Sequence, residues 1–255
     1  MGRIIAIANQ KGGVGKTTTC VNLCCALHNR GKRILLCDAD PQGNSTSGMG
    51  LNKSLSPNIY DMLINGVNAA DAIVKSAYGD VIPSNKNLSG AIVELVGVYE
   101  REYVLKKALE PLRDSYDYIF IDCPPSLEML TLNALCAATS VLVPVQCEYY
   151  AMEGLSDLLT TIRMIKQKLN PEIEIEGLLL TMYDKRTNFS EQVAEEIRRH
   201  FGTRVYRNSI PRNVRIGEAP SHGKPVIAYD RMSKGSRAYL AFSNEFLKRE
   251  SEAAI

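Results

Sequence analysis

The chain has 255 residues, 45% of them hydrophobic and 23% charged, which excludes collagen-like, low-complexity and wholly disordered proteins. The net charge of +2 conceals an uneven distribution. Residues 185–249 hold 14 Lys+Arg against 6 Asp+Glu, a local net of +8, whereas the other 190 residues have a net of −6. The C-terminal quarter is therefore a candidate surface for an anionic partner.

The first half of the chain alternates short apolar runs with amphipathic segments. Residues 3–8 are an apolar run that leads into a glycine-rich turn, which is typical of a buried parallel strand before a phosphate loop. The further elements that we expect are a helix at 16–29, a strand at 33–37, a loop at 40–51, helical turns at 58–64 and 69–75, a strand ending at 81–83 and a helix at 102–112.

The second half continues this alternation. We expect strands at 118–121, 141–145, 173–181 and 204–206, and helices at 152–169, 191–201 and 234–248. Strands that alternate with helices predict an α/β fold, in which a mostly parallel, doubly wound sheet has helices on both faces. Because no repeat or linker divides the sequence, we expect residues 1–255 to form a single domain.

The sharpest motif follows the first strand and opens the first helix. Its glycines allow backbone N–H groups to converge on phosphate oxygens, and the helix N-terminus adds a favourable potential. Lys16 is expected to reach the β- and γ-phosphates of a nucleotide, and the Thr17 hydroxyl to bind Mg²⁺. The standard pattern GxxxxGK[ST] needs glycine where this chain has Gln10. The residues expected around the phosphates are Lys11, Gly12, Gly13, Val14, Gly15, Lys16, Thr17 and Thr18.

Carboxylates follow two of the predicted strands. Asp38 and Asp40 come after the strand at 33–37, and Asp122 comes after the apolar run at 118–121. The carboxyl ends of parallel strands meet at one edge of a sheet, so these groups should lie beside the phosphate loop. Asp122 is placed to hold Mg²⁺ through water, and Asp40 to orient an attacking water. The alternatives are a solvated strand end for Asp122 and an Asx-turn for Asp40.

The cysteines and the apolar runs predict no further site. Cys20 and Cys24 share a helix face and Cys123 follows Asp122, but other ligands at metal-site spacing are absent from the sequence. The opening apolar run is too short for a signal peptide, and the longest apolar runs have the length of strands. We therefore expect buried, reduced thiols in a soluble cytoplasmic protein.

These residues resemble the ParA/Soj family of partitioning ATPases, a branch of the ParA/MinD superfamily of P-loop ATPases with a deviant Walker A motif. The resemblance extends over essentially the whole chain. The segments that carry it are residues 11–18, 38–44, 121–126, 144–150, 181–184, 186–188, 210–214 and 218–223.

The resemblance implies a catalytic role for two lysines. ATP binding would join two monomers into a sandwich dimer with both nucleotides at the interface. Lys11 would reach the phosphates of the partner subunit, and Gly12 would allow the close approach. Lys16 and Thr17 would keep the roles given above, and Thr18 would contact the α-phosphate.

The resemblance also implies roles for the acidic residues and for an adenine pocket. Asp38 and Asp122 would hold the water shell of Mg²⁺. Asp40 would position the attacking water and complete the catalytic set with the two lysines. The residues implied to contact adenine are Met182, Pro211 and Asn213.

The partners that the resemblance implies are nucleic acid and a second protein. The ATP-bound dimer would bind double-stranded DNA without sequence preference. Hydrolysis would be slow and stimulated by a ParB-type protein at a centromere-like site, and the cycle would partition chromosomes or plasmids. We therefore expect a cytoplasmic, nucleoid-associated homodimer without stable membrane association.

Arginines concentrate in the basic C-terminal quarter. They predict salt-sensitive contacts to the DNA backbone, since the sequence contains no helix-turn-helix or zinc module. Arg212 and Arg215 also lie beside the implied adenine contacts, and a solvated face is the alternative for the whole group. The arginines expected to contact DNA are Arg186, Arg198, Arg199, Arg204, Arg207 and Arg215.

Two other functions fit the same motifs. The first is a MinD-like ATPase that cycles on membranes and places the division site, but residues 246–255 turn acidic and lack a long apolar face. The second is a metabolic enzyme on the same fold, such as an amide ligase or an electron-transfer reductase. We favour the partitioning ATPase because its motifs extend over the whole sequence.

Overall fold

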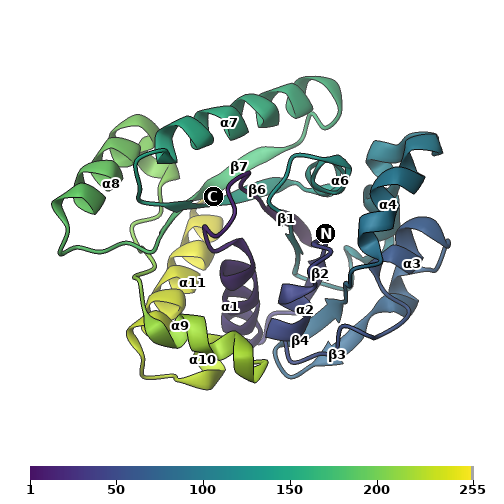
Figure 1. Ribbon diagram of the computed structural model, residues 1–255, viewed down its shortest axis with the longest axis horizontal. Coiled ribbons are helices and arrows are strands. Elements are labelled where there is room, and N and C mark those ends of the chain that lie inside the picture. The colour runs from purple at the N-terminus through teal and green to yellow at the C-terminus, as the bar shows by residue number, and fades with distance from the viewer. Residues whose placement is uncertain (254–255) are drawn as a thin grey trace.

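The computed structural model describes residues 1–253, and a single seven-stranded sheet runs through its centre (Figure 1). The strands are β1 Arg3–Ile7, β2 Ile34–Asp38, β3 Val74–Ser76, β4 Gly79–Ile82, β5 Tyr118–Asp122, β6 Ser140–Gln146 and β7 Glu174–Thr181. Their order is β3-β4-β2-β5-β1-β6-β7, and every neighbouring pair is parallel except β3 with β4. The predicted mostly parallel α/β sheet is confirmed.

Helices cover both faces of the sheet. They are α1 Lys16–His28, α2 Asn44–Gly48, α3 Ile59–Ile64, α4 Leu88–Glu94, α5 Val104–Leu109, α6 Met129–Ala137, α7 Ala151–Lys168, α8 Asn188–Phe201, α9 Val214–Glu218, α10 Val226–Tyr229 and α11 Lys234–Ala253. Ile4 and Ala6 of β1 pack in one core with α3 to α8, whereas Ile5 and Ile7 pack in the other with α1, α10 and α11. The sheet is therefore doubly wound, as predicted.

The C-terminal helices α10 and α11 are hydrogen-bonded to α1, on the same face of the sheet (Figure 1). The hydroxyls of Thr19 on α1 and Tyr239 on α11 share a hydrogen bond of 3.3 Å. Asn22 Oδ1 accepts a hydrogen bond of 2.8 Å from the N–H of Val226, the first residue of α10. Segments about 200 residues apart in sequence thus form one packed unit with the helix that follows the phosphate loop.

We expected residues 40–51 to form a loop, but they contain the helix α2. The helix follows Gly43, whose φ of +62° lies in the left-handed region that favours glycine. A Cβ at this position would stand 2.6 Å from the carbonyl oxygen of Ser84. Ser45 and Thr46 are fully buried, so the polar composition of this segment reflects a buried site.

The predicted strand at 204–206 is wrong. Gly202–Arg204 is a 3₁₀ turn, and Val205 makes a single bridge to Leu178 of β7. The Tyr206 N–H donates to the Leu178 carbonyl oxygen at 2.9 Å, and the carboxylate of Glu245 on α11 then accepts the N–H groups of Arg207 and Asn208, at 2.8 Å each. Beyond Tyr206, a side chain of α11 thus replaces the strand partner that a sheet would provide.

Smaller differences concern short elements. In the segment 69–75, only Ala69–Ala72 is helical, as a 3₁₀ turn, and Val74 already begins the antiparallel edge strand β3. The helices α4, α6, α9 and α10 are not in our expectation. None of the helices in residues 1–253 combines the length and apolarity needed to span a membrane.

Candidate functional site

The phosphate loop lies between β1 and α1, and neighbouring strands fix its course. Asn9 Nδ2 donates to the carbonyl oxygen of Pro144 on β6 at 2.7 Å, and Asn9 Oδ1 accepts from the Lys11 N–H at 3.0 Å. The Thr181 hydroxyl, at the end of β7, donates to the Val14 carbonyl oxygen at 2.8 Å. The loop is therefore held on both sides by the sheet.

The loop leaves the first turn of α1 available to an anion. Gly13 and Gly15 have φ values of +76° and +92°, which glycine adopts without strain. No side chain in residues 1–253 caps α1, so its first N–H groups are free to bind phosphate oxygens. Thr17 and Thr18 line a cavity of about 360 Å³ at this point. These features fit a nucleotide phosphate chain.

The two lysines of the loop differ in burial. Lys16 is buried, and its Nζ donates to the Lys11 carbonyl oxygen at 3.1 Å. Burial lowers the pKa of Lys16, and the charges of Asp122 and Asp40 partly oppose this change. The Lys11 side chain is more exposed and forms an ion pair with Glu148, which follows β6. Lys16 therefore points into the site, while Lys11 lies at its rim.

Asp38 and Asp122 lie side by side at the carboxyl edge of the sheet. They end the neighbouring strands β2 and β5, where they are register partners, and both are fully buried. Asp38 Oδ2 accepts hydrogen bonds from the Thr46 N–H at 2.8 Å and the Thr46 hydroxyl at 2.6 Å. Burial raises the pKa of Asp38 to about 6 despite these hydrogen bonds. The structure thus brings the two predicted carboxylates together.

Asp122 is a buried carboxylate without a hydrogen-bond partner on either oxygen among the described residues. Burial, followed by the charge of Asp38, raises its pKa well above the usual value. A divalent cation would offset both effects. Residues 1–253 contain no preformed cage of three or more His, Cys, Asp or Glu. Mg²⁺ keeps several waters and binds through one or two carboxylates plus substrate phosphates, which is a requirement that Asp122 and Asp38 fit.

Asp40 lies at the same edge, nearly buried, and forms an Asx-turn. Its Oδ1 accepts the Gln42 N–H at 2.9 Å, which is the structural alternative that the sequence left open. This hydrogen bond occupies one carboxylate oxygen. The other oxygen, Oδ2, makes no hydrogen bond to any group in residues 1–253. The turn and a water-orienting role are thus compatible.

Sequence reasoning missed two residues that fix the segments of Asp38 and Asp40. The Thr46 hydroxyl, besides donating to Asp38, accepts the Ser84 N–H at 2.9 Å. The Ser84 hydroxyl donates to the Asp40 carbonyl oxygen at 2.8 Å, and both residues are fully buried. Ser84 follows the end of β4 closely, so the rule that led to Asp38 and Asp122 would also have found it. Thr46 gave no such signal, because α2 was not expected.

The implied adenine contacts lie partly around one cavity. The Tyr183 N–H donates to the Ile210 carbonyl oxygen at 3.0 Å, which places the segment after β7 beside residues 210–213. Pro211 and Asn213 line a cavity of about 780 Å³ here. Met182, half-buried with φ +49°, precedes this segment but is not among the described residues that line the cavity.

The arginines predicted to contact DNA are dispersed. Arg186 and Arg207 line the same cavity as Pro211, and Arg186 is ion-paired with Asp184. Arg199 and Arg204 are exposed at the end of α8 and in the turn that follows. Arg198 and Arg215 are engaged within the chain: the former lies over the Tyr183 ring at 5.7 Å, and the latter pairs with Glu218 and Asp230. Two of the six therefore line this cavity, two are exposed near the end of α8, and two make contacts within the chain.

Comparison with known proteins agrees with this arrangement. A family model described as an AAA domain matches residues 2–175. The sporulation initiation inhibitor protein Soj of Bacillus subtilis is 55% identical over 248 residues, covering 96% of this chain and 98% of that protein. The chromosome partitioning protein ParA of Myxococcus xanthus is 52% identical over 254 residues, covering 98% of this chain and 90% of that protein.

A solved structure shares the fold of this chain over nearly its whole length. Cobyrinic acid a,c-diamide synthase from Mycobacterium smegmatis, with bound ATP analogue and magnesium, has a TM-score of 0.87 and 37% identity. The match covers 99% of this chain and 97% of that chain. More than half of the residues of both Soj and ParA are retained over nearly their full length, so this chain belongs to the Soj/ParA family of chromosome-partitioning ATPases.

Proposed function

We propose that this protein is an ATP-dependent switch that partitions DNA. It binds ATP and Mg²⁺, forms a homodimer in the ATP state and binds double-stranded DNA without sequence preference. It hydrolyses ATP slowly until a ParB-type partner stimulates it. The diamide synthase is less similar to this chain than Soj, 37% against 55% identity, so we favour partitioning over a metabolic reaction.

The observation that carries the proposal is the buried Asp122 carboxylate, which lies beside Asp38 and makes no hydrogen bond to any residue of 1–253. Asp122 and Asp38 would hold Mg²⁺ through its water shell, with the Thr17 hydroxyl as a direct ligand. When bound, Mg²⁺ neutralises charge on the phosphates and on these carboxylates. An arrangement that leaves buried charge unpaired is costly without such a ligand.

The chain's own residues would bind and orient the nucleotide. Lys16 and the first N–H groups of α1 would hold the phosphates, while Asp40 would orient the attacking water by accepting its hydrogen bond. Lys11 would leave Glu148, with which it is paired in the monomer, to reach the phosphates of the partner subunit. Charge neutralisation of the γ-phosphate by both lysines makes dimer assembly depend on ATP.

The basic C-terminal quarter supplies the DNA surface in this proposal. Its local net charge of +8 is spread over α8, the turns on either side of α8 and the C-terminal helices. Contacts to the DNA backbone are salt-sensitive and sequence-tolerant. A dimer presents this surface twice, so the avidity rises when ATP joins the subunits. The protein would then act in the cytoplasm, on the nucleoid.

A mobility-shift assay with the full chain tests the switch. Double-stranded DNA is titrated with ATP, with ADP and without nucleotide, each at two salt concentrations. We expect a shift with ATP that weakens at higher salt. Equal binding in all three nucleotide states would contradict the proposal. Sedimentation with anionic liposomes and ATP tests the MinD-like alternative, and strong ATP-dependent co-sedimentation would favour it over DNA partitioning.

A further inference from the structure

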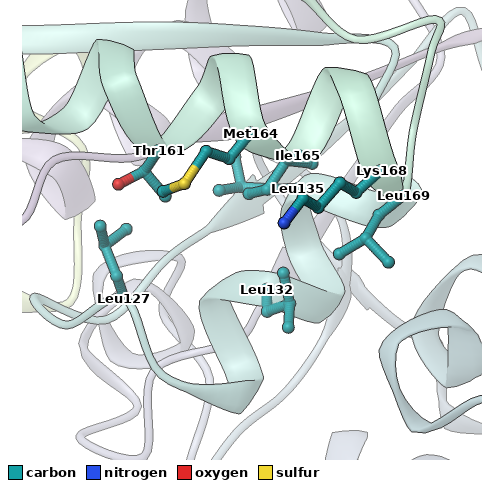
Figure 2. A pocket seen from close by; sticks show the side chains of 8 residues that line it. All are labelled: Leu127, Leu132, Leu135, Thr161, Met164, Ile165, Lys168 and Leu169. Atoms are coloured by element: carbon teal, nitrogen blue, oxygen red, sulfur yellow. The ribbon is translucent and has the colours of Figure 1, made fainter.

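An apolar groove lies between α6 and α7, on the face of the sheet opposite α1 (Figure 2). Its volume is about 280 Å³. The apolar side chains that line it are Leu127, Leu132, Leu135, Met164, Ile165 and Leu169. Met164 is 49% exposed although it is apolar. An open apolar groove of this kind at the surface of a protein commonly marks an interaction site.

The volume of the groove limits what can occupy it. It is about twice that of an engineered cavity of about 150 Å³ that accepts benzene. Two or three apolar side chains fit this space. The groove therefore suits the apolar anchors of a short peptide segment.

Lys168 is the charged residue in the lining. Its nitrogen points into the groove, toward the space between the two helices (Figure 2). Lys166 on the same helix is paired with Glu174, but no carboxylate in the part of the chain described here forms an ion pair with Lys168. A cation above an apolar lining is complementary to a ligand with an apolar body and one carboxylate.

We propose that this groove docks an amphipathic, acidic peptide segment of a partner protein. Two apolar side chains of the segment, one helical turn apart, fill the space between Leu132 and Met164. An Asp or Glu of the segment pairs with Lys168. This is the helix-in-groove mode of recognition, in which apolar anchors supply affinity and a charge sets orientation.

Both helices of the groove lead back to the phosphate loop. Leu127 lies five residues after Asp122, and between them Pro125 packs near Gly12, where an added Cβ would stand 4.0 Å from the proline Cβ. At the other side, α7 begins three residues after Glu148, the ion-pair partner of Lys11. A bound segment therefore contacts the first connection directly, at Leu127, and is linked to the second through the length of α7. Its effect on the rate of ATP hydrolysis rests on the function proposed above.

The test selects peptides of about 12 residues from a random displayed library on the full wild-type chain, after depletion on Met164→Asp. We expect enriched peptides with two apolar residues at i and i+3 or i+4 and one Asp or Glu. The dissociation constant should rise about 10-fold or more for Met164→Asp and Lys168→Glu. Arg163→Glu, the same charge change on an exposed part of α7 outside the lining, should leave it within about twofold.

Three results would overturn the docking proposal. The first is that no peptide is enriched above the depleted background, and the second is that Arg163→Glu loses as much affinity as the groove substitutions. The third is that the chain binds phosphatidylglycerol vesicles and that the same two groove substitutions abolish this binding. That third result would assign the groove to a lipid. A peptide in which Lys replaces the acidic residue should regain affinity for Lys168→Glu. Failure of this exchange would contradict the pairing of that acid with Lys168.

A separate measurement tests the coupling to hydrolysis. Saturating peptide should change the steady-state ATPase rate of the wild type about threefold or more, and that of Met164→Asp not at all. Peptide binding without a change in rate would overturn the coupling and leave the docking site intact. A wild type that hydrolyses no ATP would instead overturn the proposed function, whatever the peptide does.

Discussion

The two charged regions of the molecule hold their groups in different ways. At the carboxyl edge of the sheet, Lys16, Asp38 and Asp122 are buried and enclosed by several strands. In the basic C-terminal quarter, Arg204 and Arg207 are exposed to solvent. A buried charge depends strongly on each neighbour, whereas exposed charges are screened and add small increments. Function should therefore fail abruptly at the first region and decline gradually at the second.

The largest expected effect is that of Lys16→Ala. It removes the buried cation that faces the phosphates, so nucleotide affinity should fall at least about 100-fold, or about 2.7 kcal/mol. Isothermal titration calorimetry with ATP and Mg²⁺ measures this change. Lys86→Ala, at an exposed lysine outside the site, is the matched control and should bind as the wild type does. Affinity within threefold of the wild type in Lys16→Ala would contradict the assignment.

Asp40→Asn separates the two interpretations of that residue. The amide oxygen of asparagine still accepts the Gln42 N–H, so the Asx-turn stays. The charge that would orient water is lost, and hydrolysis should fall about 10²- to 10⁴-fold with ATP and DNA binding retained. Single-turnover phosphate release measures the rate. Normal hydrolysis would leave Asp40 with the turn alone.

Thr46→Val tests how the buried carboxylates are held. The substitution keeps the shape of the side chain but removes its hydrogen bonds to Asp38 and from the Ser84 N–H. We expect the free energy of unfolding to fall by about 2–3 kcal/mol. Urea denaturation without Mg²⁺ measures it, and Thr46→Ser, which keeps the hydroxyl, is the control. Equal stability of the two variants would mean that the hydroxyl contributes nothing.

The raised pKa of Asp38 predicts a pH dependence of stability. Because the folded state binds this proton more tightly than the unfolded state, Asp38 stabilises the fold most below its usual pKa of 3.8. This contribution is lost as the pH rises through about 6. The measurement compares the free energies of unfolding of the wild type and of Asp38→Asn without Mg²⁺. The wild-type value minus the variant value should decrease from pH 4 to pH 6. A constant difference across this range would exclude the shift.

Substitutions in the basic quarter should have the smallest effects. Arg204→Ala and Arg207→Ala should each weaken DNA binding several-fold, equally for all sequences, and reduce the salt slope by about one. Fluorescence anisotropy at several salt concentrations measures both quantities. Arg163→Ala, on α7 and outside this region, is the control. Loss that depends on DNA sequence would mean that base contacts, not phosphates, are made here.

Much of the fold follows from periodicity, and the differences have local causes. Apolar runs such as 118–121 and 141–145 form strands that are buried on both faces of the sheet. Their continuous apolar composition reflects this burial and made them predictable. The segment 204–206 carries the same signal, and the Tyr206 N–H does donate to Leu178 of β7, but Glu245, from a helix about 40 residues later, accepts the N–H groups of Arg207 and Asn208, so the strand does not continue. A tertiary hydrogen bond of this kind leaves no trace in the local sequence.

The candidate site, too, was predicted only in part. Spacing after strands placed Asp38 and Asp122 correctly as neighbours, because parallel strands bring their carboxyl ends together. The buried Thr46 depends on α2, a five-residue helix too short to show a hydrophobic period. Exposed arginines carry no periodic signal either. The sequence therefore predicted a basic surface, but not which arginines are exposed and which make contacts within the chain.

The hydrogen bonds from α1 to the C-terminal helices also define a mechanical path. If DNA bound to the basic quarter is pulled, tension enters through α10 and α11 and reaches α1 through Asn22 and Thr19. It thereby bypasses some 200 residues of intervening chain. The helix that begins at the phosphate loop would then bear the load directly, so a tethered cargo could strain the loop without first deforming the sheet.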